Sequence, residues 1–440
     1  MIDYTAEQLQ ELEQLKVTDQ EIQILKRMSI GTLPPSNLGR DDMILFQLTA
    51  YRDYELYFIK EQRLERLGYN SAKNFMSNMG FNKRYFEDLH VLMMKKVFEP
   101  DQPKWRLDNN IWLYNEYQKS EYSTIYQFYR DYAKKKGINK NSTRELKLPP
   151  LHREFFNNVF NDELSIEYMA IKVKRLLSGI TKSNTYTILR GIGGSGKSMF
   201  LHYLSTLIGL QQSRVANYKD ITGSFNGELF RSVIVTIEEL PMSLWNCNDF
   251  MRALKEYVAN ERINIRRKFR ENETIKNFTN FFITTNYFDL YETMAERRHC
   301  EVVSRNIKLI DTPLFSQLNI KKIDFIEALL YEAPLFFKAL LEWDCHRFTF
   351  NSKFISPTII NYKQVRSGSD HRVTMLLDAL IDHDYARILS FNDLEMNTLA
   401  ILAHYDRETK KFRIPLEVAK EHYFLMDNLD FLTYNGIIIK

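Results

Sequence analysis

The chain contains 440 residues, of which 44% are hydrophobic and 26% are charged. This length and composition predict a globular protein with two or three domains. The net charge of +4 is too small to indicate nucleic-acid binding by itself, and three widely separated cysteines argue against a disulfide framework or a zinc site. No run of 18 apolar residues occurs and the acidic N-terminus lacks a signal-peptide core, so we expect a cytoplasmic protein without membrane contact.

The first third of the chain is predicted to be mostly helical. Residues 4–30 contain a segment, Thr18 to Glu21, that resembles a helix capping box. Between residues 41 and 133, apolar side chains recur at spacings of three and four, which is typical of helices. Examples are Ile44, Leu45, Leu48 and Tyr51. We therefore predict a helical N-terminal domain over residues 1–145 that serves as a collar, a loader or a partner-binding surface.

Two further domains are expected after this one. A basic, turn-rich stretch at residues 134–144 is either a solvated tether or a contact for nucleic-acid phosphates. Strand-like and helix-like segments then alternate, which predicts an α/β domain over residues 146–350. The last part, residues 351–440, holds a helix-like run at 371–381 and a short terminal piece at 431–439. That pattern is compatible with a small winged-helix module.

A glycine-rich motif in the α/β domain predicts ATP binding. It lies between a β-prone run, residues 186–189, and a helix-like run, residues 199–204, as a phosphate-binding loop requires. The residues expected to bind ATP are Gly191, Gly193, Gly194, Ser195, Gly196, Lys197 and Ser198. Glycines allow backbone N–H groups to face phosphate oxygens at the helix N-terminus, and Lys197 would reach the β- and γ-phosphates. Ser198 would hold Mg²⁺.

Two later strand-like runs end in polar side chains that ATP hydrolysis needs. Residues 232–237 form a buried-type run followed by Glu238 and Glu239, which would position the metal and polarise water. Residues 280–285 precede Asn286, whose amide would orient the attacking water. The alternative for Asn286 is a plain cap at the end of a strand.

Basic residues cluster in the interval between these strands. Lys255 precedes a stretch, residues 263–276, whose alternation predicts a β-hairpin with a cationic tip. The tip contains Arg266, Arg267, Lys268, Phe269 and Arg270. Cations beside an aromatic ring suit a nucleic-acid strand threaded past them, although a solvated hairpin is the alternative. Arg297 and Arg298 follow, and one of them would complete the ATP site of a neighbouring subunit.

The order of these motifs resembles the superfamily 3 helicases, which are AAA+ motors of viruses, phages, plasmids and integrated elements, and most of all the primase-helicase type. The resemblance covers residues 150–345 and includes Asn226-Gly227, Lys255-Glu256 and Thr285-Asn286. It implies an AAA+ fold with a central parallel sheet. It also implies metal binding by Ser198 and Glu238, water activation by Glu239, and a sensor role for Asn286. The basic hairpin would face DNA in a central channel.

The same resemblance implies a hexameric ring that hydrolyses ATP with Mg²⁺, moves 3′ to 5′ on single-stranded DNA and unwinds forked DNA during phage or mobile-element replication. A primase, polymerase or initiator would be the replication partner. The chain departs from many relatives in its Glu-Glu pair, and His299-Cys300 follow the arginines. Residues 1–145 contain no nicking motif and no paired-aspartate primase centre. The alternatives are a helicase loader, a replication initiator or a defence NTPase that uses ATP as a switch.

Overall fold

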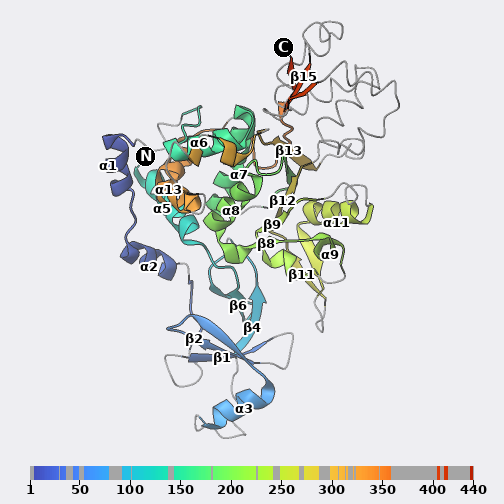
Figure 1. Ribbon diagram of the computed structural model, residues 1–440. Helices are drawn as coiled ribbons and strands as arrows, with labels where there is room; N and C mark the ends of the chain where they lie inside the picture. The colour runs from blue at the N-terminus through green and yellow to red at the C-terminus, as the bar shows by residue number, and fades with distance from the viewer. Residues whose placement is uncertain are drawn as a thin grey trace.

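The computed structural model describes most of the first 357 residues and three short strands beyond them (Figure 1). The described part is residues 4–357 except 29, 36–42, 49–53, 79–91, 101, 137–142, 180–181, 224–225, 241–247, 267–271, 287–297, 306, 313, 316–320, 322–323 and 346, together with 404–406, 411–414 and 437–439. Within this part, no helix has the length and apolar composition needed to cross a bilayer.

A five-stranded parallel sheet is the centre of the α/β region. Its strands in chain order are β7 (Tyr186–Arg190), β8 (Ser213–Val215), β9 (Ile234–Ile237), β12 (Asn280–Thr285) and β13 (His299–Val303). In space they follow the order β13-β7-β12-β9-β8, and every pair is parallel. β7, β9 and β12 are buried along their whole length, as their apolar sequences predict. The predicted α/β class with a parallel sheet is confirmed.

Helices cover both faces of this sheet because alternate side chains of its strands point in opposite directions. Leu189 packs in a core with α6 (Pro150–Val159), α7 (Glu163–Gly179), α8 (Lys197–Ile208) and α13 (Phe325–Glu342). Its neighbour Ile188 packs in a second core with α9 (Tyr218–Thr222) and α11 (Asn248–Ala259). Figure 1 shows α11 and α9 on the side of the strands away from α7 and α8. The result is a three-layer α/β/α domain.

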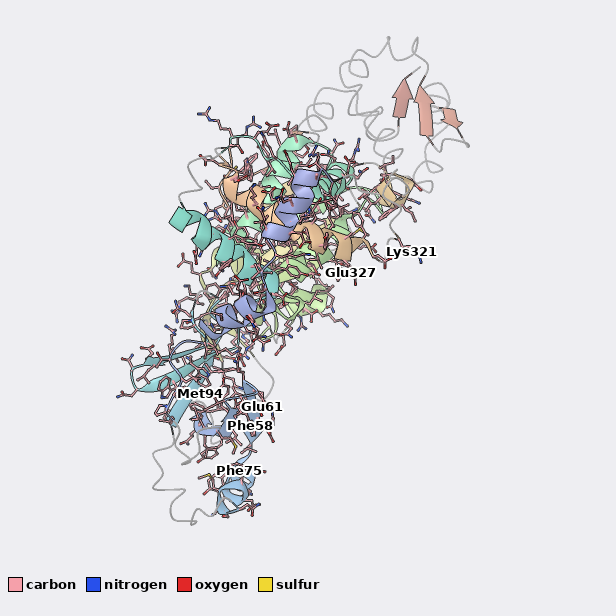
Figure 2. All side chains as sticks on the ribbon, turned by 90° about the vertical axis from the view of Figure 1, so that its left-hand side faces the viewer. Phe58, Glu61, Phe75, Met94, Lys321 and Glu327 are labelled. Carbon is pink, nitrogen blue, oxygen red and sulfur yellow. The ribbon has the colours of Figure 1, made fainter. Side chains whose placement is uncertain are left out.

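The prediction of a mostly helical N-terminal domain is wrong for most of the described residues between 43 and 115, which form a six-stranded mixed sheet. Its strands are β1 (Met43–Leu48), β2 (Tyr54–Phe58), β3 (Arg63–Leu67), β4 (Leu92–Val97), β5 (Trp105–Asp108) and β6 (Ile111–Asn115), in the spatial order β3-β2-β1-β4-β6-β5. α3 (Tyr69–Asn78) lies beside it, and Figure 2 labels Phe58, Phe75 and Met94 in this part.

The wrong helix prediction for this interval has a physical cause. Ile44, Leu45 and Leu48 belong to one short apolar strand whose side chains enter two cores, one on each face of the sheet. A run that is apolar on both faces satisfies a helical spacing as well as a strand spacing. Residues 79–91, in the same predicted helical interval, lie outside the described residues, and β4 begins directly after them.

The remaining N-terminal helices pack on the α/β domain. α1 (Ala6–Gln14) contacts α13, and Lys338 of that helix pairs with Glu11. α2 (Asp19–Met28) contacts α5 (Glu121–Lys136), which itself packs against α7, α8 and α13. The capping box predicted before α2 is confirmed, since the backbone N–H of Thr18 donates to the Glu21 carboxylate at 2.9 Å and that of Glu21 donates to the Thr18 hydroxyl at 3.3 Å.

The C-terminal region is described only as three short strands, β14 (His404–Asp406), β15 (Lys411–Ile414) and β16 (Ile437–Ile439), which form one sheet. The predicted helix at 371–381 lies outside the described residues. So does most of the segment predicted as a winged-helix module.

A buried polar network joins three helices beneath the central sheet. The Glu332 carboxylate on α13 accepts hydrogen bonds from the backbone N–H groups of Leu151 and His152 at 3.0 and 2.9 Å. His152 Nδ1 lies 2.6 Å from Glu332 Oε2, and His152 Nε2 lies 2.6 Å from the Tyr203 hydroxyl on α8. Burial opposes ionisation of Glu332, yet the hydrogen bonds and charge of His152 hold its pKa below the usual value. The network therefore ties α8 to α6 and α13.

We expect Glu332→Ala to lower the free energy of unfolding by about 3 kcal/mol, because it leaves buried N–H groups and His152 without their acceptor. Glu327→Ala removes an exposed carboxylate from the same helix and should change stability by less than about 0.5 kcal/mol. Urea unfolding followed by circular dichroism measures both. Equal losses in the two variants would show that the network contributes no stability.

Candidate nucleotide-binding site

The glycine-rich segment connects β7 to α8, in the arrangement that the sequence predicts. The backbone has positive φ angles of 140° at Gly191, 83° at Gly194 and 99° at Gly196, which side-chain-bearing residues rarely adopt. Gly196 is also the N-cap of α8, so Lys197 and Ser198 occupy the first turn of the helix. The helix N-terminus adds positive partial charge to this loop. The loop thus has the backbone form of a phosphate cradle.

Neighbouring segments approach the glycines so closely that side chains would not fit. A Cβ atom on Gly191 would lie 1.9 Å from the Ser304 hydroxyl, and one on Gly196 would lie 2.8 Å from Val159 Cγ2. Gly193 differs, because its nearest neighbour would be Asn286 Nδ2 at 3.9 Å. Gly193 therefore faces the end of β12, while the other two glycines are held between packed segments.

The ammonium of Lys197 is surrounded by oxygen atoms of its own site. Lys197 Nζ donates to the carbonyls of Gly191 and Ile192 at 2.6 and 2.7 Å, and to Asn286 Oδ1 at 3.2 Å. Its side chain is only 6% exposed. Burial lowers the pKa of Lys197 to about 8, and the nearby Glu239 carboxylate offsets part of this effect. These oxygen atoms accept the hydrogen bonds that Lys197 would otherwise donate to phosphate oxygens.

The two acids and the amide lie at the same edge of the sheet as the loop, because β7, β9 and β12 are parallel neighbours. Glu238 and Glu239 follow β9 and are exposed, and Asn286 follows β12 and is also exposed. Glu239 has a positive φ of 49°, and its backbone N–H donates to the Thr284 hydroxyl at 3.0 Å. Such a backbone angle is uncommon in a glutamate. Together with the hydrogen bond to Thr284, it fixes the direction in which the Glu239 side chain leaves the backbone.

These residues fit ATP and Mg²⁺ by their chemistry. The cradle admits close approach at Gly193, Lys197 supplies a cation, and the exposed Ser198 hydroxyl and Glu238 carboxylate are oxygen ligands of the kind that Mg²⁺ takes. When bound, Mg²⁺ would neutralise phosphate charge. The protein's own part would be to hold the triphosphate and to place Glu239 and Asn286 where they could orient water.

Three residues that the sequence did not predict as part of the site pack against the phosphate loop, namely Ser304, Lys308 and Leu309. The Ser304 hydroxyl lies 2.7 Å from the buried Ser195 hydroxyl, and the backbone N–H of Leu309 donates to the Gly194 carbonyl at 2.8 Å. Lys308 lies against Gly194, with its Cγ 3.4 Å from the position of an added Cβ. Lys308 thus adds an exposed cation at the rim of the cradle. No local motif marks these residues, because parallel pairing of β13 with β7 brings them here.

The predicted basic hairpin is confirmed as a pair of strands. β10 (Arg262–Ile265) pairs antiparallel with β11 (Glu273–Lys276). Arg266 is described and exposed, whereas Arg267, Lys268 and Arg270 lie outside the described residues. Lys255 lies on α11 and is half-buried.

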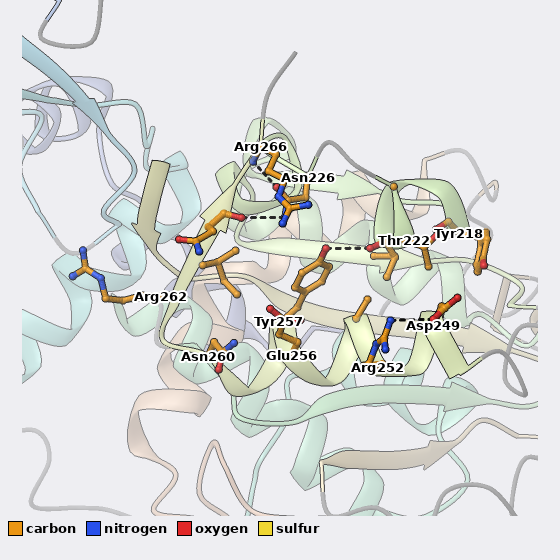
Figure 3. Close-up of a pocket in the computed structure, with 15 residues that line it drawn as sticks. Tyr218, Thr222, Asn226, Asp249, Arg252, Glu256, Tyr257, Asn260, Arg262 and Arg266 are labelled. Atoms are coloured by element: carbon orange, nitrogen blue, oxygen red, sulfur yellow. Dashed lines mark hydrogen bonds and ion pairs between the residues drawn. The ribbon is translucent and has the colours of Figure 1, made fainter. Parts of the chain in front are cut away.

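The start of the hairpin is fastened by Asn226. Its Oδ1 accepts from the Arg266 backbone N–H at 2.8 Å, and its Nδ2 donates to the Asn264 carbonyl at 3.3 Å. Figure 3 shows these bonds at a cavity of about 650 Å³ between α9, α11 and β10. At the other strand, Glu273 pairs with Lys95 of β4 at 3.4 Å. The hairpin therefore contacts the N-terminal sheet.

The two candidate arginines precede β13. Arg297 lies outside the described residues, and Arg298 is exposed. The Arg298 carbonyl accepts from the backbone N–H of Tyr186, the first residue of β7. The phosphate loop follows the other end of β7, about 16 Å away at 3.3 Å per residue. Arg298 thus lies at the opposite end of the sheet from its own chain's cradle.

Comparison with known proteins adds a family of unknown function and a shared fold. The model of the family DUF5906, whose function is unknown, matches residues 189–298, from the end of β7 to the start of β13. No curated protein matches the chain. Two apo structures of the NrS-1 C-terminal region match with TM-scores of 0.54 at 17% and 16% identity, covering 81% of this chain and 82% of theirs. This likeness shows a common fold.

We expect Gly191→Ala to weaken ATP binding at least tenfold, since an added Cβ would meet the Ser304 hydroxyl in a backbone conformation that alanine disfavours. Gly68→Ala, at an exposed position outside the loop where nothing lies within 4 Å of an added Cβ, should bind ATP within about twofold of the natural protein. Titration with a fluorescent ATP analogue measures this, and thermal melting checks that both variants fold. Unchanged affinity in Gly191→Ala would remove the loop as the ATP site.

We expect ATP affinity to fall as pH rises through 8. The pKa of Lys197 is about 8, so its charged fraction drops about tenfold between pH 7 and pH 9, and only the charged form attracts phosphate. The Michaelis constant for ATP, measured across this range, should rise accordingly. Lys197→Arg stays charged and should lose this pH dependence whatever affinity it retains. A flat profile in the natural protein would contradict the role of Lys197.

Proposed function

We propose that this protein is an ATP-hydrolysing motor that acts on single-stranded DNA and unwinds duplexes during replication of a phage or mobile element. The observation that carries the proposal is the meeting of Lys197, Glu239 and Asn286 at one edge of a parallel sheet. A phosphate cradle with a carboxylate and an amide beside it is the arrangement that nucleotide hydrolysis requires.

Each residue then has one part in hydrolysis. Backbone N–H groups of the loop and Lys197 would bind the triphosphate, and Ser198 with Glu238 would hold Mg²⁺. Glu239 polarises the attacking water, and Asn286 orients it against the γ-phosphate. Since Asn286 Oδ1 contacts Lys197 in this structure, arrival of the phosphate would release the amide toward the water. This exchange couples phosphate binding to assembly of the hydrolytic site.

A ring of subunits explains the positions of the arginine and the hairpin. Arg298 lies too far from its own cradle to reach it, so it would act on the cradle of a neighbouring copy. The sequence between β10 and β11 contains Arg266, Arg267, Lys268 and Arg270, and these cations suit contact with DNA phosphates in a central channel. The superfamily 3 resemblance supports a hexamer. The likeness to the NrS-1 C-terminal region covers 81% of this chain, so it supports the architecture of the whole domain around the site.

The decisive experiment is strand displacement on forked DNA with 3′ or 5′ tails. We expect ATP-dependent displacement by the natural protein and none by Glu239→Gln. That variant should still bind ATP, with turnover reduced at least about a hundredfold, because it keeps the cradle and loses the carboxylate that polarises water. Glu228→Gln, on an exposed turn, is the control and should unwind normally.

Failure of the natural protein on both tails, with ATP hydrolysis intact, would contradict the helicase proposal and favour a loader or switch. Normal turnover by Glu239→Gln would instead remove Glu239 as the water-polarising residue.

A further inference from the structure

A basic cleft separates the N-terminal sheet from the helices of the α/β domain. It has a volume of about 760 Å³, and its walls come from the β5 side of the sheet, from α5 and from the end of α7. Three cations line it, Lys104, Lys119 and Arg130, against one carboxylate, Glu61. This cleft is distinct from the phosphate loop, whose residues do not line it.

The two lysines are held in the cleft by neutral partners, and the nearest carboxylates, Glu116 and Asp131, act on them without direct contact. Within the described part of the chain, neither Lys104 nor Lys119 forms an ion pair. Lys104 Nζ lies 4.3 Å from the centre of the Tyr114 ring, and Lys119 donates to the Gln127 side chain. Each ammonium is thus fixed in place by a neutral partner. A half-buried cation with no carboxylate in direct contact has lost part of its hydration, and a bound anion would offset that cost.

The charge of the cleft agrees with this geometry. Burial lowers the pKa of Lys104 to about 8, although Glu116 offsets part of the effect. Burial and the neighbouring charge of Arg130 lower the pKa of Lys119 to about 8, with Asp131 acting in the opposite direction. Arg130 is itself held by the Ser178 carbonyl at 2.5 Å and by Asp131 at 3.4 Å. Three positively charged side chains, Lys104, Lys119 and Arg130, therefore line the same cleft.

We propose that this cleft binds the phosphate backbone of single-stranded DNA. The lysines and arginine would contact phosphates, and the amides of Gln62, Gln102 and Gln118 would contact phosphate or sugar oxygens along the rim. The aromatic residue in the lining, Tyr117, is only 7% exposed and offers no face for stacking a base. The cleft is thus built for a backbone and not for a free nucleotide.

The choice of DNA rests on the proposed function, whereas the anion site rests on the cleft alone. The sheet that forms one wall also contacts the hairpin, through the pair Lys95–Glu273. A strand held by the hairpin would therefore have a second basic surface on the neighbouring domain. Two separate contacts on one strand raise the overall affinity through effective concentration.

The test uses the full chain without ATP or Mg²⁺. Binding of a fluorescent 20-nucleotide oligo-dT is followed by anisotropy at several salt concentrations. We expect Lys104→Gln/Lys119→Gln to weaken binding about tenfold and to reduce the salt slope by about 1.4, which is about 0.7 for each of two phosphate contacts. Lys73→Gln/Lys353→Gln removes the same charge from positions outside the cleft and should bind like the natural protein. Identical affinities and slopes in both double variants would overturn the proposal.

A second measurement needs no variant. Lysine acetylation of the natural protein, read by mass spectrometry, should be slowed at Lys104 and Lys119 by oligo-dT and unchanged at Lys353. Protection by inorganic phosphate or ATP but not by oligo-dT would overturn the assignment to DNA, and protection by none of them would overturn the anion site. Protection by oligo-dT in a protein that fails to hydrolyse ATP would remove the motor function and support the cleft.

Discussion

The buried ammonium of Lys197 is the constraint on which the site depends. A cation that is 6% exposed must be surrounded by oxygen atoms, and here the loop carbonyls and Asn286 provide them. Those oxygens come from segments that follow β7 and β12, so the two strands must lie side by side and end together. Strand pairing, glycine conformation and the position of Asn286 are therefore all needed to place oxygen atoms around the Lys197 ammonium. A nucleotide bound at this site would replace hydrogen bonds that Lys197 now makes to the loop carbonyls and to Asn286.

α8 connects this site to other parts of the molecule. Its first turn holds Lys197 and Ser198, and its middle joins the network of Glu332 through Tyr203. Near its last turn, the Leu207 carbonyl accepts from the Ser120 hydroxyl at 2.5 Å, beside the linker that enters α5. One helix therefore contacts the phosphate loop, the helical core and the segment leading to the N-terminal sheet. The phosphate loop and the basic cleft are therefore connected through the two ends of α8.

Local patterns account for what the sequence could predict. The phosphate loop is contiguous, and β9 and β12 are short apolar runs with polar ends, so the loop, Glu239 and Asn286 were found from neighbouring residues. The N-terminal sheet was missed because β1 is apolar on both faces and pairs with β4, which begins more than forty residues later. Ser304 and Thr284 were missed for a related reason. Each acts through a strand pairing, and an isolated serine or threonine at the end of a strand carries no signal of its own.

The position of Arg298 also constrains how copies of the chain can assemble. The cradle and Arg298 lie at opposite ends of one parallel sheet. An arginine of one copy can reach the cradle of another only if opposite ends of the two sheets meet. A two-fold dimer meets this condition when its sheets lie antiparallel, because residue i then contacts residue j and residue j contacts residue i. A head-to-tail contact meets it as well, and a closed ring is then needed to supply every cradle. The proposed motor encloses a DNA strand, so the ring is the arrangement that goes with that proposal.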